Sequence, residues 1–98
     1  MKIRLSNNTI RIRLSQSDLE CIKNGISLSI QLPIGTQDVV FTLKCGDTIE
    51  YNANEISIAL PQTTLFPWIA SRETSLSTTL TYPNNRTLHL IVEKDYLG

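Results

Sequence analysis

The stretch MKIRLSNNTIRIRLS, residues 1–15, alternates between apolar and polar residues on both sides of an Asn-Asn pair. Successive side chains of a β-strand point to opposite faces, so this alternation is typical of two half-buried strands. Asparagine tolerates the positive φ that a tight turn requires, and Asn7-Asn8 therefore predicts a hairpin turn. In the register that follows, Arg4 lies opposite Arg11.

This hairpin separates its side chains into an apolar face and a basic face. We expect the apolar face to contact the core, and it consists of Ile3, Leu5, Ile10, Ile12 and Leu14. The basic face consists of Lys2, Arg4, Arg11 and Arg13. Like charges directly opposite each other destabilise a sheet, so another group must offset this repulsion.

The segment after the hairpin carries the start and stop signals of a short helix. Ser15 is placed to be the N-cap, and Asp18 three residues later completes a capping box. Leu19 and Ile22 lie three positions apart on one helical face. Gly25 predicts a left-handed residue that ends the helix.

Two further strands follow this helix. Apolar residues alternate with polar ones over residues 26–32, beginning at Ile26, which predicts a half-buried strand. Pro33–Gln37 then predicts a turn, and residues 38–44 a second strand. Together the two strands form a second hairpin.

The second half of the chain repeats the first. Residues 48–60 again alternate, about Ala53-Asn54, and a shift of 46 gives seven identities over residues 3–19, where ordinary residue usage gives about one. Pro67 cannot sit inside a helix without losing a hydrogen bond, so the second helix should begin near it and span at most two turns. Residues 76–82 and 87–94 then predict the last two strands.

These patterns predict an α+β fold in a single domain, 1–98, with an internal pseudo-repeat of 1–46 and 47–98. Each half is β-β-α-β-β, which gives about eight mostly antiparallel strands and two short helices around one core. Each helix should cover one face of its sheet, and the two halves should bury those faces together. The pattern leaves one curled sheet, two sheets or a partial barrel open. We expect the core to contain Ile10, Ile12, Leu14, Leu19, Ile22, Ile56, Ile58, Leu60, Leu65 and Trp68.

Composition narrows the function classes. Nine basic and nine acidic residues cancel, which argues against nucleic acid or a membrane as a general electrostatic partner. Cys21 and Cys45 match no metal or redox spacing. No signal peptide or membrane-spanning run is present, so we expect a reduced, cytoplasmic protein.

The basic face is the main candidate site. With Glu93 and Asp95 on the last strand, it could bind an anion such as phosphate or a carboxylate ligand. The alternative is that these carboxylates lie on a neighbouring strand and simply neutralise the face. The candidate residues are Lys2, Arg4, Arg11, Arg13, Glu93 and Asp95.

Other clusters give weaker hypotheses. His89 shares a strand face with Glu93 and Asp95, a set that could hold a metal, although a histidine beside carboxylates is more often an ion-pair partner. The cluster of residues 65–69 could be a recognition patch, because Trp and Phe favour interfaces. Alignment with the first helix favours core packing of Leu65 and Trp68 and leaves Phe66 without a core counterpart. No catalytic triad or glycine-rich phosphate loop is present. We therefore assign no catalytic residue, metal or cofactor.

The function that these observations favour is a non-enzymatic binding or self-assembling module. Residues 39–41 and 88–92 carry apolar side chains on both strand faces, which indicates burial between layers or a dimer interface. The expected partner is therefore a protein or another copy of the chain. The alternative is a small anion-binding protein or enzyme that uses the basic face.

The two ends of the chain resemble a known family. The opening MKIR, followed by IRIRLS, and the ending VEKDY are similar to those of a family of small uncharacterised bacterial proteins. The resemblance covers about a quarter of the chain and differs at the end, where this chain stops at Gly98 in place of a cysteine-containing tail. It implies no residue roles.

Overall fold

The computed structural model describes residues 1–47, 49–52 and 54–95, with side chains at all of these except Tyr51 and Asn52. Its architecture is α+β, as predicted. The elements are β1 (Lys2–Ser6), β2 (Thr9–Leu14), α1 (Gln16–Lys23), β3 (Leu28–Ile34), β4 (Gln37–Cys45), β5 (Ile49–Asn52), β6 (Glu55–Leu60), α2 (Gln62–Ala70), β7 (Ser75–Tyr82), a 3-10 turn η1 (Pro83–Asn85) and β8 (Arg86–Lys94).

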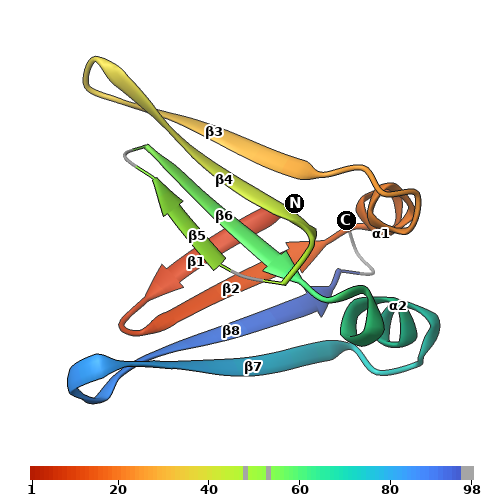
Figure 1. Ribbon diagram of the computed structural model, residues 1–98. Helices are drawn as coiled ribbons and strands as arrows, with labels where there is room; N and C mark the ends of the chain where they lie inside the picture. Colours follow the sequence, from red (N-terminus) through yellow and green to blue (C-terminus); the bar gives the residue numbers. More distant parts are fainter. Residues whose placement is uncertain (48, 53, 96–98) are drawn as a thin grey trace.

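The strands form two four-stranded sheets (Figure 1). One has the order β1-β2-β8-β7 and the other β3-β4-β6-β5. Each hairpin is antiparallel, whereas β2 runs parallel to β8 and β4 runs parallel to β6. Each sheet therefore takes one hairpin from each half of the chain. The sequence pattern left one curled sheet, two sheets or a partial barrel open, and the strand pairing gives two sheets.

Corresponding strands of the two halves pair in the same register. Ile3 pairs with Ile12 in the first hairpin, and Ile49 pairs with Ile58 in the equivalent hairpin, a shift of 46 at both positions. The order of elements is also the same in both halves. Superposition of the two halves as bodies remains a prediction.

The local signals around the first hairpin act as predicted. Asn8 has a φ of 60° in the turn, and Gly25 has a φ of 76° after α1. Ser15 Oγ accepts a hydrogen bond from the Asp18 backbone N–H, and Asp18 accepts one from the Ser15 backbone. The Asp18 carboxylate also lies 2.7 Å from the Met1 amino group. Partial burial raises the pKa of Asp18, but the hydrogen bonds from Met1 and Ser15 outweigh it and lower the pKa overall.

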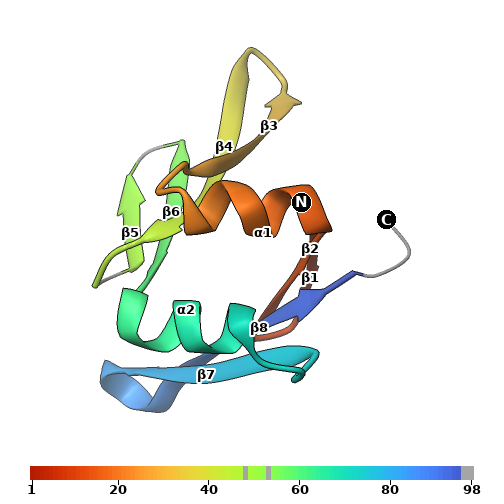
Figure 2. The ribbon, with the colours of Figure 1, turned by 90° about the vertical axis from the view of Figure 1, so that its right-hand side faces the viewer.

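The core lies between the sheets at the end where the helices pack. Figures 1 and 2 show α1 and α2 side by side at this end, with the hairpin turns at the other. Of the predicted core residues all are buried except Ile56, which is half-buried. Phe66 and Ile3 pack against this core. Leu5 is 59% exposed, because it lies toward the end with the hairpin turns, away from the helices.

The boundaries of β3 differ from the prediction. The strand begins at Leu28, and Ile26 is 55% exposed. It then continues through Pro33, and the turn comes at Gly35, which has a φ of 63°. Proline lacks a backbone N–H but is tolerated here because β3 is an edge strand.

The second helix begins earlier than predicted. It starts at Gln62 and contains Pro67, so it is longer than two turns. Proline removes the hydrogen bond that its own N–H would make in a helix, and its ring crowds the carbonyl four residues earlier. The burial of Leu65 and Trp68, at 0% and 4% exposure, offsets that loss. None of the helices in the described ranges is both long and apolar enough to cross a membrane.

The core assignment predicts the effect of truncating an equivalent pair of residues. Leu14→Ala and Leu60→Ala should each lower the free energy of unfolding by about 2–5 kcal/mol, because each leaves a cavity in the packed core. Ile26→Ala serves as the control and should have little effect, since Ile26 is exposed. Urea denaturation followed by circular dichroism measures all three. Urea midpoints of Leu14→Ala and Leu60→Ala equal to that of the wild type would contradict the core assignment.

The contacts of Asp18 predict a pH-dependent contribution to stability. Its folded pKa lies below the ordinary value of 3.8, so its stabilising effect is fully present above that value and is lost as the pH falls through the folded pKa. Asp18→Asn should therefore cost about 1 kcal/mol at pH 7 and progressively less in acid. Denaturation of both proteins between pH 7 and pH 2 tests this. A difference that stays constant over that range would refute it.

Candidate functional site

The basic face lies on the outer surface of the β1-β2-β8-β7 sheet. Arg4 pairs with Arg11 and Lys2 with Arg13, as the sequence register predicted. All four residues are exposed or half-buried. The parallel pairing of β2 with β8 then places Glu93 directly beside Arg13.

Two carboxylates from the end of the chain neutralise part of this face. Arg11 Nη1 forms an ion pair and hydrogen bond with Glu93 Oε1, and Arg13 Nε lies 3.9 Å from Glu93 Oε2. Lys2 Nζ lies 3.7 Å from Asp95 Oδ2. The structure therefore brings five of the six candidate residues together as ion pairs. Glu93 offsets the repulsion between the arginines.

Arg4 differs from the other three cations. Within the described residues it has no ion-pair partner. Its side chain contributes to a pocket of about 160 Å³ on the edge of the sheet. That pocket is lined by Lys2, Ile3, Arg4, Arg11 and Arg13. The rim of β1 consequently carries an excess of positive charge.

His89 lies apart from the ion pairs on β8. Its Nδ1 is 3.1 Å from Thr79 Oγ1 on the neighbouring strand. Across the described ranges, no group of three or more His, Cys, Asp or Glu residues could hold a metal ion. The structure thus gives His89 a cross-strand hydrogen bond.

The sequence reasoning missed the role of Lys94. It is only 9% exposed, and its Nζ donates hydrogen bonds to the Trp68 carbonyl at 2.9 Å and the Ser71 carbonyl at 2.7 Å. The Nζ also lies 5.0 Å from the centroid of the Trp68 ring. A cation that caps the carbonyl end of a helix stabilises that helix. Strand alternation was the available signal, because it places Lys94 on the inner face with Leu90 and Val92.

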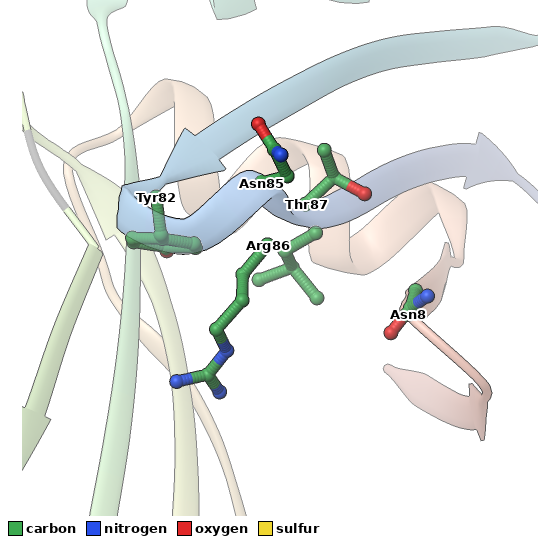
Figure 3. A pocket seen from close by; sticks show the side chains of 6 residues that line it. Asn8, Tyr82, Asn85, Arg86 and Thr87 are labelled. Carbon is green, nitrogen blue, oxygen red and sulfur yellow. The ribbon is translucent and has the colours of Figure 1, made fainter.

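A second site that the sequence did not indicate surrounds the β7–β8 turn. A cavity of about 630 Å³ opens there. Figure 3 shows the Arg86 side chain extending away from the turn, with Tyr82 on one side and Asn8 on the other. Arg86 has no ion pair with any described residue. The cavity offers hydrogen-bond donors and acceptors and one exposed aromatic ring. Its lining is Asn8, Tyr82, Asn85, Arg86, Thr87 and Leu88.

An apolar cleft lies between the edge strands β1 and β3. It has a volume of about 180 Å³ and is lined by Ile3, Leu5, Ile30, Leu32 and Phe41. Leu5 and Leu32 are 59% and 47% exposed. These residues belong to the inner faces of the two sheets, which is why their sequence pattern suggested core packing. Leu5 and Leu32 are exposed because the helices lie only at the other end of the space between the sheets (Figure 1).

The comparisons with known proteins place the chain in a family. The model described as "Family of unknown function (DUF7009)" matches residues 1–97. The chain belongs to this family. No curated protein and no solved structure matches it. Membership in DUF7009 agrees with the resemblance to an uncharacterised family and assigns no residue roles.

The ion pairs on this DUF7009 chain predict opposite effects for two neighbouring arginines. Arg11→Ala should lower the free energy of unfolding by up to about 1 kcal/mol, because it leaves Glu93 without its closest partner. Arg4→Ala, the matched control, should leave it unchanged or raise it by about 0.2–1 kcal/mol, since it relieves a cross-strand repulsion.

Thermal unfolding with and without phosphate tests both expectations. Destabilisation by Arg11→Ala, with a wild-type Tm that does not respond to phosphate, would show that the ion pairs are structural. A wild-type Tm raised by phosphate, with Arg11→Ala no less stable than the wild type, would instead favour an anion site.

Proposed function

We propose that this protein is a non-enzymatic binding module that receives an extended protein segment in the cleft between β1 and β3. The observation that carries the proposal is the combination of two facing edge strands and an apolar cleft between them. An edge strand presents backbone N–H and C=O groups that can pair with another strand. An exposed apolar patch gains free energy when it is covered.

The size of the cleft fits the side chains of a bound strand. A dry apolar cavity of ~150 Å³ holds a benzene molecule, so this cleft has room for one or two aliphatic side chains. The backbone of the segment would lie along the strand edge, where main-chain hydrogen bonds provide affinity and the cleft provides specificity. Pro33 limits pairing on β3, and β1 is therefore the better edge.

The partner is either another protein or a second copy of the chain. A homodimer would use the same exposed apolar residues, including Leu32 and Ile34. The MKIR opening and VEKDY ending support a bacterial origin. The free thiols of Cys21 and Cys45 support a reducing, cytoplasmic location.

Anion binding at the basic pocket is the second candidate function. The Arg4 guanidinium, which has no ion pair with a described residue, favours it, because a pocket lined by four cations attracts phosphate or a carboxylate. The ion pairs of Arg11 and Arg13 with Glu93 count against it, since a ligand would have to compete with that carboxylate.

The primary proposal is tested with an uncharged eight-residue peptide of alternating Val and Thr. Methyl NMR of the full chain should show saturable shifts at Leu5, Ile30 and Leu32, with little change at the buried Ile22. Leu5→Ser combined with Leu32→Ser should weaken binding by about tenfold or more, because each substitution removes apolar contact area. Ile26→Ser, exposed outside the cleft, is the matched control and should bind normally.

Two further measurements complete this test. A peptide of the same composition with prolines at alternate positions should not bind, since proline cannot join a strand ladder. Sedimentation velocity of the protein alone distinguishes a second copy from another partner. Absence of cleft shifts with the Val-Thr peptide, together with a monomer at all concentrations, would refute the proposed function.

A further inference from the structure

The alternation of β1 determines what a strand beside it must look like. Lys2 and Arg4 point to the outer face of the sheet, and Ile3 and Leu5 line the cleft. Residues directly opposite each other on adjacent strands share a face. A segment added to β1 would therefore place one set of side chains in the cleft and the alternate set against the cations.

The charge on this rim is not balanced within the described residues. The basic face has four cations but forms ion pairs with only two described carboxylates, Glu93 and Asp95. Both carboxylates lie on the side of β2 and β8. Arg4 has no partner among the residues that the structure describes. The side chain of Lys2 is 75% exposed, and its contact with Asp95 spans 3.7 Å. The edge that faces the cleft therefore carries positive charge available to a ligand.

This charge also determines which strands are rejected. Pairing of β1 with β1 of a second copy would bring cations opposite cations, which is destabilising. A basic segment would be repelled for the same reason. The outer face of β3 contributes Ser29 and Gln31, which are uncharged, so selection by charge comes from β1.

We propose that the segment bound at this edge alternates apolar and acidic residues and adds to β1 as a new strand. This inference rests on the proposed function and specifies the chemistry of its partner. Apolar side chains of the segment would enter the cleft beside Leu5, and its carboxylates would contact Arg4 and Lys2. A nucleic acid fits less well, because one wall of the site is aliphatic and the chain has no net charge.

The test uses three eight-residue peptides with identical valines and with Glu, Gln or Lys at the alternate positions. Fluorescence anisotropy with the full chain should show that the Glu peptide binds about fivefold tighter than the Gln peptide, as expected for two partly exposed ion pairs. The Lys peptide should bind more weakly than both. Salt at 0.5 M should reduce the difference between the Glu and Gln peptides.

Charge reversal on β1 provides the decisive variant. Arg4→Gln should lower the preference for the Glu peptide over the Gln peptide from about fivefold to about twofold, because Lys2 remains, and Arg4→Glu should remove it, because the new carboxylate cancels the charge of Lys2. Arg4→Glu should be compatible with the strand, because a glutamate, Glu50, occupies the equivalent position on β5. Lys23→Glu, which changes an exposed cation at the end of α1, is the matched control and should leave the order unchanged.

Backbone methylation tests the mode of binding. Methylating alternate backbone nitrogens of the Glu peptide on the edge that would face β1 should abolish binding, because strand addition needs those N–H groups. Undiminished binding of the methylated peptide would overturn strand addition.

The remaining outcomes separate this inference from the proposed function. Equal binding of all three peptides to the wild type would overturn the acidic preference and leave the proposed function intact. No binding by any peptide, with the protein a monomer at all concentrations, would remove both. Glu50 on β5 could supply the acidic residue from a second copy. If the protein alone dimerises and Glu50→Gln abolishes the dimer, the inference is overturned in favour of a second copy. Displacement of the Glu peptide by a short oligonucleotide at equal affinity would overturn it in favour of a general polyanion site.

Discussion

The parallel pairing of β2 with β8 is the constraint on which the rest of the structure depends. Parallel neighbours cannot be joined by a tight turn, so this contact must bring together strands that are distant in the sequence. It connects the first hairpin with the last one and places Leu90 and Val92 beside Ile10 and Ile12. The equivalent pairing of β4 with β6 builds the other sheet in the same way. Neither half could bury its apolar faces alone.

The same pairing creates the edges that we propose as a binding site. When two hairpins join through one strand of each, the other two strands become the edges of that sheet. The edges are β1 and β7 in one sheet and β3 and β5 in the other. The two short helices cover only one end of the space between the sheets. Apolar side chains at the other end, such as Leu5 and Leu32, therefore remain exposed although they share a strand face with the core.

Glu93 and Lys94 show how one strand serves two environments. The side chains of β8 alternate, so Glu93 points outward to the arginines while Lys94 points inward to the end of α2. The outer pair offsets charge repulsion on a solvated face. The inner lysine donates hydrogen bonds to two carbonyl groups at the end of α2, and at Trp68 it adds to the hydrogen bonds that Ser71 donates to the same oxygen. The residues that the sequence suggested as a ligand site thus form ion pairs that offset charge within the sheet.

The sequence by itself determined the local structure of this protein. The register of the first hairpin, the capping box of Ser15 and the left-handed Gly25 depend on contacts within a few residues, and such contacts are visible as alternation, spacing and turn chemistry. The approximate positions of all strands follow from the same patterns. The predicted element boundaries were wrong at Pro33 and Pro67. An edge strand tolerates the missing N–H of Pro33, and the burial of two side chains of α2 offsets the loss at Pro67.

Only the tertiary structure decided which strands became neighbours and which apolar residues stayed exposed. The pattern of β1 is the same whether its apolar face meets a helix or an open cleft, so Leu5 could not be distinguished from Ile12 by sequence. Likewise, six charged residues suggested a site, but the parallel register of β2 and β8 determined that Arg11 and Arg13 meet Glu93 while Arg4 does not. Long-range pairing carries no local signal, because its free energy arises only when the two halves pack together.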